Sequence, residues 1–211
     1  MLKIDLTLYH YWRSSSSWRV RWGLNLKKIP YDAVAVDLLS GEEKSGEHFV
    51  RNPAKYLPTI EVEGRYLSES LAILEWLEET HPTPSFFTGD AFMRARIRQL
   101  AETVNAGIQP LQNLGVMQKV SENKDEQKSW VKHWIERGLG VYEELIAEYK
   151  GKFSVCDSPT LADLCLIPQC YSALRFGVDL KEYARCNAVY ESALTTSECV
   201  AAHPDSFQPK N

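Results

Sequence analysis

The sequence lacks the features that mark several large classes of protein. None of its apolar runs approaches the roughly 18 residues that a membrane-spanning helix needs. Its beginning shows no charged segment followed by an apolar one, so we expect no secretory signal. It also lacks an excess of positive charge, because the formal net charge of the 211 residues is −4. This balance argues against nucleic acid as a partner.

Cysteine is scarce and has no regular spacing. The five cysteines are an odd number and include no C-x-x-C pair. They are Cys156, Cys165, Cys170, Cys186 and Cys199. This pattern fits free thiols in a reducing compartment better than disulfides or a metal site. We therefore expect a cytoplasmic protein without a bound metal.

The chain is rich in the residues that build a core. Hydrophobic residues make up 44% of it and include six tryptophans, which is ample for packed domains. Strand and helix patterns alternate over the first 80 or so residues. Strands are predicted at 4–9, 31–36, 58–62 and 65–67, and helices at 16–27, weakly at 43–50, and at 69–80. This β-α-β-α-β-β-α order predicts an α/β thioredoxin-like domain over residues 1–82.

The composition changes after the segment His81-Pro82-Thr83-Pro84, which ends a helix and reads as a linker. Strand patterns disappear, and helices are predicted at 89–121, 125–150 and 160–175, with shorter pieces to about 200. Thr160 and Asp163 have the spacing of a capping box at the start of an apolar helix. We predict an all-helical substrate-binding domain over residues 88–211, with a poorly ordered polar tail from His203.

The most informative stretch is the serine run Ser14–Ser17, which follows the first strand and opens a helix. The first turn of a helix has unpaired N–H groups and a partial positive charge. No acidic residue occurs from position 12 to 28, where Arg13, Arg19, Arg21, Lys27 and Lys28 lie. Serine hydroxyls in such a place can donate to a thiolate, carboxylate or phosphate. A linker would be the alternative, but the following Trp-Arg-Val-Arg-Trp indicates a helix.

Two further segments suggest a peptide-like ligand. A cis proline at Pro58 would turn the Leu57 N–H and C=O outward, where they could pair with an extended backbone. The alternative is an ordinary turn proline. Ser70 and its helix N-terminus can hold a carboxylate, and Glu69 can hold an ammonium group, although both also suit helix capping alone. A thiolate site, a backbone-pairing segment and an amino-acid-head site together describe a pocket for glutathione.

Six segments together match one family. They are Tyr11–Arg21, Asn52-Pro53, Leu57–Thr59, Glu69–Ile73, Gly107–Asn113 and Ala162–Gln169. They resemble the zeta class of glutathione transferases, whose members include maleylacetoacetate isomerase, over nearly the whole chain. Ser16 stands where the class usually has cysteine, Tyr56 where it usually has glutamine, and Glu69 where glutamine is common.

The resemblance implies glutathione as a cofactor and a homodimer, while the composition argues against a membrane or nucleic acid as a partner. It implies cis-trans isomerisation of maleylacetoacetate to fumarylacetoacetate in tyrosine and phenylalanine breakdown, with transferase or α-haloacid activity alongside. Glutathione would be held by two groups of residues. The first comprises Ser14, Ser15, Ser16, Ser17 and Arg19, and the second comprises Leu57, Pro58, Glu69, Ser70, Gln109 and Asn113.

Within this set the resemblance assigns activation of the thiol to Ser14, with Ser15 beside it. Gln109 would act within or across subunits from a long helix that also carries Asn113. Arg175 is the first candidate for binding the dianionic substrate and for catalysis, and Arg13 is the second. The alternative for Arg175 is a surface arginine at a helix end.

Other readings remain open at this point. Tyr9 and Tyr11 could activate the thiol, as tyrosines do in other transferase classes, although we favour core packing for both. The protein could instead conjugate electrophiles with glutathione, or could be a non-catalytic dimer that keeps the fold. Trp130 and Trp134 are predicted to be core or interface residues.

Overall fold

The computed structural model describes residues 5–209, and these form two compact units. The first unit comprises residues 5–85 together with 196–209, and the second comprises 86–195. The first is an α/β unit of the thioredoxin-like kind and the second is helical, which confirms the predicted fold class.

The first unit is built on a sheet with the strand order β2-β1-β3-β4. The strands are β1 (Leu6–His10), β2 (Asp32–Ala35), β3 (Thr59–Val62) and β4 (Arg65–Ser68). β1 pairs in parallel with β2 and antiparallel with β3, and β3 pairs antiparallel with β4. The predicted hairpin is confirmed, and Glu63 and Gly64 both have the positive φ that a tight hairpin turn requires. Ile4, part of the predicted first strand, lies outside the described residues.

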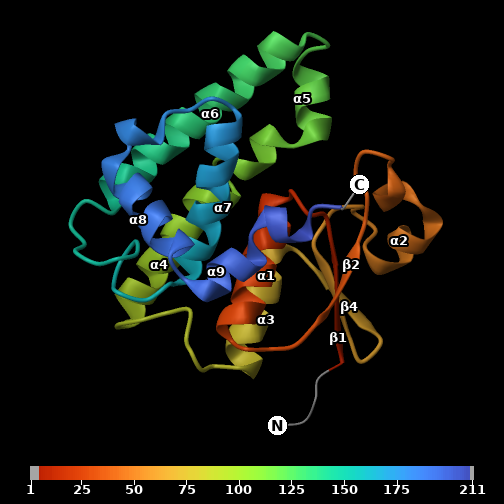
Figure 1. Ribbon diagram of the computed structural model, residues 1–211, viewed down its shortest axis with the longest axis horizontal. Coiled ribbons are helices and arrows are strands. Elements are labelled where there is room, and N and C mark those ends of the chain that lie inside the picture. The colour runs from red at the N-terminus through yellow and green to blue at the C-terminus, as the bar shows by residue number, and fades with distance from the viewer. Residues whose placement is uncertain (1–4, 210–211) are drawn as a thin grey trace. The chain divides into compact units, whose positions relative to one another are not determined.

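The helices of this unit lie on both faces of the sheet. They are α1 (Ser15–Leu26), α2 (Gly46–Arg51), which follows a 3-10 turn at Glu42–Lys44, and α3 (Ser70–Thr80). Figure 1 shows α1 and α3 together on one face and α2 on the other. Leu8, Trp18, Trp22 and Leu74 have no exposed surface, so the core lies between the sheet and the α1–α3 layer.

The end of the chain packs onto α1. It forms α9 (Ser197–Ala202) and a 3-10 turn, η4 (Pro204–Phe207). The buried Arg21 donates from Nε to the Ala202 carbonyl at 3.0 Å, and its guanidinium lies 4.5 Å from the Phe207 ring centroid. The His203 ring meets the Trp18 ring edge-on.

This packing differs from two of our expectations. The prediction of a poorly ordered tail from His203 is wrong for the described residues up to 209. The last segment also groups with the first unit, whereas the sequence predicts that it belongs to the helical domain. The physical reason is the buried Arg21, to which this segment supplies the Ala202 carbonyl as an acceptor and the Phe207 ring as a packing surface.

The contact between Arg21 and His10 predicts how stability depends on pH. His10 is 2% exposed, and its Nδ1 lies 3.1 Å from the Arg21 guanidinium. Burial and this neighbouring cation lower the pKa of His10 from 6.5 to about 4. The unfolded chain therefore binds the proton at a higher pH than the folded chain does. We expect the free energy of unfolding to fall by about 3 kcal/mol as the pH drops from the unfolded to the folded pKa.

Urea unfolding across this pH range measures the effect, with His10→Gln as the comparison. Glutamine keeps an acceptor for Arg21 but does not titrate, so the variant's stability should fall less steeply. Burial also lowers the pKa of His203. Because the wild type and His10→Gln both contain His203, its contribution to the pH dependence cancels when the two proteins are compared. Identical pH slopes in the two proteins would contradict the prediction.

The second unit is helical throughout its described elements. These are α4 (Ala91–Asn105), the 3-10 turn η2 (Gln109–Gln112), α5 (Leu114–Val120), α6 (Lys124–Leu145), α7 (Leu161–Arg175), the 3-10 turn η3 (Leu180–Glu182) and α8 (Ala184–Leu194). Helix α4 packs against α7. The predicted helix at 160–175 is confirmed, with both bonds of the Thr160–Asp163 capping box. Within residues 5–209 no helix is long and apolar enough to cross a membrane.

The predicted long helix at 89–121 is wrong, because the chain forms α4, η2 and α5 there. A Cβ at Gly107 would lie 2.6 Å from the Thr103 carbonyl oxygen, so the chain turns tightly at this glycine. Pro110 then removes an N–H donor, and Asn113 starts a new helix as the N-cap of α5. Gln109 and Asn113 therefore lie in a turn and at a helix start.

Candidate active site

The serine run forms the N-terminus of α1. Ser14 is the N-cap residue, and its Oγ accepts a hydrogen bond from the Ser17 N–H at 3.2 Å. Its own N–H donates to the Tyr11 carbonyl at 3.1 Å, which fixes the turn between β1 and α1. Among the described residues the hydroxyl proton of Ser14 has no acceptor. Since a hydroxyl can accept and donate together, Ser14 is free to donate to a ligand.

Backbone donors surround that hydroxyl. The N–H groups of Ser15 and Ser16 take part in no hydrogen bond between described residues, and both residues are half-buried. The first turn of α1 contains no acidic residue, so its partial positive charge is not offset there. This arrangement fits an anion.

Ser17 differs from the rest of the run. It has no exposed surface, and its Oγ accepts from the Tyr11 N–H at 3.4 Å. The side chain therefore supports the turn from within. The expectation that Ser17 contacts glutathione is not met in this conformation, because a ligand cannot reach it.

Arg19 joins α1 to the start of α3. Its guanidinium donates to the Ser70 Oγ at 3.1 Å, and the residue has no exposed surface. The sequence predicts that Arg19 helps to hold glutathione, but its burial beneath the surface gives it a positioning role. The bond holds Ser70, which is 4% exposed, at a constant place relative to α1.

Glu69 has an unusual backbone conformation. It precedes α3 with φ 69 and ψ 114, a region that residues other than glycine rarely adopt. Its side chain is exposed and makes no capping hydrogen bond. Capping alone therefore does not explain this side chain, whereas an exposed carboxylate fits an ammonium group.

The Leu57–Pro58 peptide bond is cis, as the sequence predicted. Leu57 is half-buried, and its N–H and C=O enter none of the hydrogen bonds between described residues. The preceding carbonyl, that of Tyr56, accepts hydrogen bonds from His48 and Asn52. The sequence predicts no role for His48, and Asn52 stands out there only as part of a family motif. The sequence features that point to these two residues are the position of His48 in the weakly predicted helix at 43–50 and the pair Asn52-Pro53.

The two tyrosines pack as expected. The Tyr9 hydroxyl donates to the Glu61 carboxylate at 2.8 Å, and burial and this bond raise the pKa of Tyr9. The Tyr9 hydroxyl proton is therefore engaged in the hydrogen bond to Glu61 and is harder to remove than that of an ordinary tyrosine. Tyr11 is 7% exposed and has its hydroxyl buried. Core packing is the better interpretation for both.

The remaining candidates are placed as follows. Arg13 is half-buried, with its guanidinium 5.3 Å from the Trp12 ring centroid. In the second unit, the Gln109 Nε2 donates to the Asn113 Oδ1 at 2.8 Å. Arg175 is exposed in the last turn of α7, where a cation is also favourable for the helix. The described residues contain no group of side chains suited to a metal ion.

The second unit also contains the two tryptophans noted in the sequence. Trp130 and Trp134 stack edge-on with ring centroids 5.6 Å apart, and both are half-buried. The Trp130 Nε1 donates to the Leu111 carbonyl at 3.0 Å. Trp130 therefore braces the η2 turn that carries Gln109.

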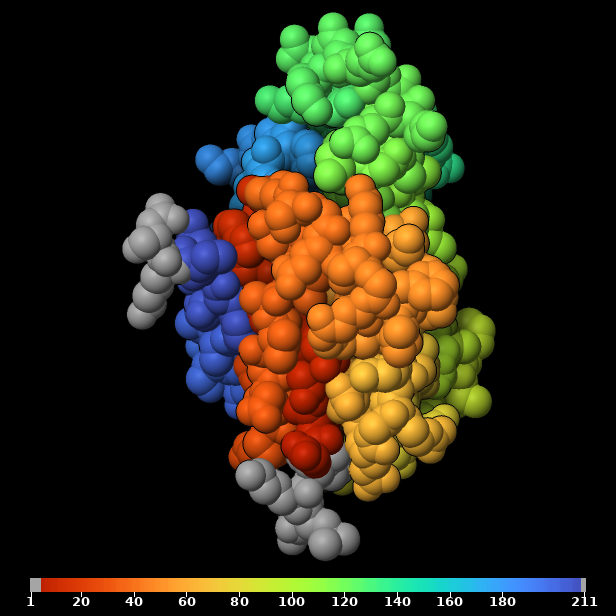
Figure 2. Space-filling view, turned by 90° about the vertical axis from the view of Figure 1, so that its right-hand side faces the viewer, coloured from red at the N-terminus to blue at the C-terminus, as the bar shows by residue number. Residues whose placement is uncertain are grey.

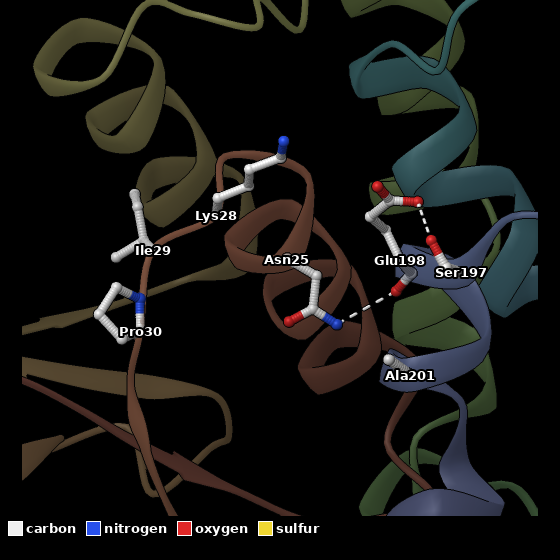
Figure 3. Close-up of a pocket in the computed structure, with 7 residues that line it drawn as sticks. All are labelled: Asn25, Lys28, Ile29, Pro30, Ser197, Glu198 and Ala201. Carbon is white, nitrogen blue, oxygen red and sulfur yellow. Dashed lines mark hydrogen bonds between the residues drawn. The ribbon is translucent and has the colours of Figure 1, made fainter.

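A surface depression of about 600 Å³ lies elsewhere in the first unit, between the end of α1 and α9 (Figure 3). Asn25 donates across it to the Glu198 carbonyl at 3.1 Å. The other lining residues are Lys28, Ile29, Pro30, Ser197 and Ala201. None of the candidate residues lines it, so it is not the site described above.

Comparison with known proteins agrees with this geometry. The family model of the glutathione S-transferase N-terminal domain matches residues 8–85. The probable maleylacetoacetate isomerase 2 of Drosophila melanogaster is 42% identical over 208 residues, which cover 98% of this chain and 90% of that protein.

Two solved structures extend the comparison. A maleylacetoacetate isomerase from Anaeromyxobacter dehalogenans, with glutathione bound in its active site, is 46% identical with a TM-score of 0.89, and the match covers 100% of this chain and 99% of that one. A maleylpyruvate isomerase, described as a bacterial zeta-class glutathione S-transferase, gives a TM-score of 0.93 at 36% identity over 97% of this chain and 99% of that one. The chain therefore belongs to the glutathione transferase family, and within it to the zeta class that includes the maleylacetoacetate isomerases.

Proposed function

We propose that this protein is a glutathione-dependent isomerase that converts maleylacetoacetate to fumarylacetoacetate. The observation that carries the proposal is the start of α1, where the uncommitted Ser14 hydroxyl lies beside the free N–H groups of Ser15 and Ser16. Similarity along the whole chain to isomerases of this specificity supports the same reaction.

The described residues of the first unit fit glutathione. Ser14, Ser15 and Ser16 offer donors for the thiolate. Leu57 offers a free N–H and C=O for the peptide backbone, next to Pro58. Glu69 and Ser70 offer a carboxylate and a hydroxyl for the γ-glutamyl ammonium and carboxylate groups.

When bound, glutathione supplies a thiolate that adds to the conjugated cis double bond, allows rotation, and leaves once the product is trans. The chain's part is to keep the sulfur ionised. Ser14 donates its hydroxyl proton to the sulfur as a hydrogen bond, and the first-turn N–H groups add positive potential. Each such helix-end contribution is worth about 0.3–1 kcal/mol, so several together lower the thiol pKa towards neutrality. Ser16 places a hydroxyl where the class usually has a thiol.

We assign the substrate carboxylates to Arg175 and Arg13, since guanidinium groups pair with carboxylates through two parallel hydrogen bonds. We also retain Gln109 and Asn113 as glutathione contacts. The protein is further proposed to be a cytoplasmic homodimer that acts in tyrosine and phenylalanine breakdown.

The Arg175 assignment predicts a selective loss. Arg175→Ala should raise the KM for the dianionic substrate by about 10- to 100-fold, because a charged hydrogen-bonded pair is worth about 1.5–3 kcal/mol. Conjugation of glutathione to a neutral aryl halide should change little. Steady-state kinetics on both substrates, with Arg175→Lys as the charge-conserving comparison, measure this difference. Equal losses on both substrates would count against a carboxylate-binding role.

The function itself is tested by following maleylacetoacetate or maleylacetone spectrophotometrically, with and without glutathione. We expect isomerisation that requires glutathione but does not consume it. Binding of glutathione without isomerisation would favour a conjugating transferase. Absence of glutathione binding would favour a non-catalytic protein of this fold.

A further inference from the structure

Two buried side chains outside the set assigned above converge on one backbone oxygen. His48 is 1% exposed and Asn52 is 3% exposed. The His48 Nε2 lies 3.2 Å from the Tyr56 carbonyl oxygen, and the Asn52 Nδ2 lies 2.9 Å from the same atom. Because a carbonyl oxygen can only accept, Nε2 carries the ring proton and both side chains donate. The two bonds use both lone pairs of that oxygen.

Asn52 is itself held on several sides. Its N–H donates to the His48 carbonyl at 2.8 Å, which places it at the end of α2. Its Oδ1 accepts from the Ala54 N–H at 3.0 Å, and its carbonyl accepts from the Lys55 N–H at 2.9 Å. Lys55 has φ 59, a left-handed conformation that these bonds maintain. The loop between α2 and β3 is therefore fixed from within.

The anchored carbonyl determines where the next N–H points. Tyr56 C=O and Leu57 N–H belong to one planar trans peptide group, in which the two bonds point in opposite directions. Drawing the carbonyl inward to His48 and Asn52 therefore directs the Leu57 N–H outward. On the other side, Thr59 is fixed by its pairing with Tyr9 and Ser68. Figure 2 shows this face of the first unit, with the orange residues of α2 and its loop at the surface.

We propose that His48 and Asn52 are positioning residues for glutathione, which act by aiming the Leu57 N–H at the peptide backbone of the ligand. This inference rests on the proposed binding of glutathione at Leu57. Neither side chain touches the ligand, so their effect falls on affinity for glutathione. The chemical step at Ser14 does not depend on them.

The test is isothermal titration of glutathione into the full-length protein and its variants. Asn52→Asp keeps the oxygen that accepts from Ala54 but removes the donor to Tyr56. His48→Leu removes the other donor, and His48→Gln retains an N–H. We expect the Kd for glutathione to rise about tenfold in Asn52→Asp and in His48→Leu, and to stay within about threefold of the wild type in His48→Gln. The KM for glutathione should follow the Kd, with kcat at saturating glutathione little changed.

Ser45→Ala is the matched control. The Ser45 Oγ caps α2 by accepting from the His48 N–H at 3.2 Å, so its loss weakens the same helix but leaves both donors to Tyr56 in place. We expect a lower melting temperature and an unchanged Kd. Unchanged Kd values in Asn52→Asp and His48→Leu, or an equal rise in Ser45→Ala, would overturn the inference.

The outcomes also separate this inference from the proposed function. Glutathione binding that responds to these variants in a protein that does not isomerise would support the inference and refute the isomerase. An active isomerase whose Kd for glutathione is unchanged in Asn52→Asp and His48→Leu would support the proposed function and refute the inference. A wild-type protein that does not bind glutathione would overturn both.

Discussion

Replacing Ser14 by alanine is expected to lower kcat/KM for the isomerisation by about 10- to 100-fold, because a hydrogen bond to a charged group contributes about 1.5–3 kcal/mol. The hydroxyl proton of Ser14 is uncommitted among the described residues, and the oxygen is already turned towards the helix N-terminus by the Ser17 N–H. Alanine removes the hydroxyl donor but leaves the Ser15 and Ser16 N–H groups. Residual activity should therefore remain.

The thiol pKa gives a direct measurement of this effect. Ultraviolet absorbance of the thiolate, followed against pH in the complex with glutathione, should show the pKa of the bound thiol raised by about 1–2 units in Ser14→Ala. Activity should recover as the pH is raised through the new pKa, because the variant still holds the ionised form once it is made. A turnover defect that is the same at every pH would argue against thiolate stabilisation.

Control variants separate this role from helix capping. Ser14→Ala also removes the N-cap of α1, which costs about 1 kcal/mol of stability. Ser14→Thr keeps both the cap and the donor, so it should retain most activity. Tyr9→Phe should leave turnover intact, because the Tyr9 proton is held by Glu61. Undiminished turnover in Ser14→Ala would transfer the role to Ser15, or to Tyr9 if Tyr9→Phe proved inactive.

The parts of the fold that local rules determine were predictable from the sequence. Ser14 and Thr160 are residues whose side chains cap helices, and Glu63-Gly64 has the composition of a hairpin turn. These features depend on a few neighbouring residues. The helices and strands around them therefore appear close to the predicted positions.

The parts that distant contacts determine were not predictable. Nothing near Arg21 in the sequence indicates that its acceptor would be the carbonyl of Ala202, and so the ordered end of the chain was missed. Arg19 and Ser17 look like ligand-contacting residues in the serine run, but packing of α1 buries both. The break near Gly107 depends on its close approach to the Thr103 carbonyl, whereas the apolar pattern continues through it.

Replacing Asp163 by alanine is expected to destabilise the second unit by about 4 kcal/mol, since each buried donor left without a partner costs about 1–3 kcal/mol. Asp163 has no exposed surface, and its Oδ1 accepts from the Ser154 N–H at 2.8 Å. Its Oδ2 accepts from the N–H and the hydroxyl of Thr160, at 2.8 and 2.9 Å. Ser154 and Thr160 are 1% and 2% exposed, so these three donors are shielded from bulk solvent.

Urea unfolding of Asp163→Ala measures the loss, and Asp157→Asn in the same loop is the matched control. Asp157 is exposed, and its Oδ1 accepts from the Lys152 N–H at 3.2 Å, a bond that asparagine can keep. The control should change stability by less than about 0.5 kcal/mol. Since domains are stable by only about 5–15 kcal/mol, the Asp163 variant should also yield much less folded protein. If the two variants unfold at the same urea concentration, the carboxylate of Asp163 does not hold this loop to α7, and the start of α7 must be held by apolar packing alone.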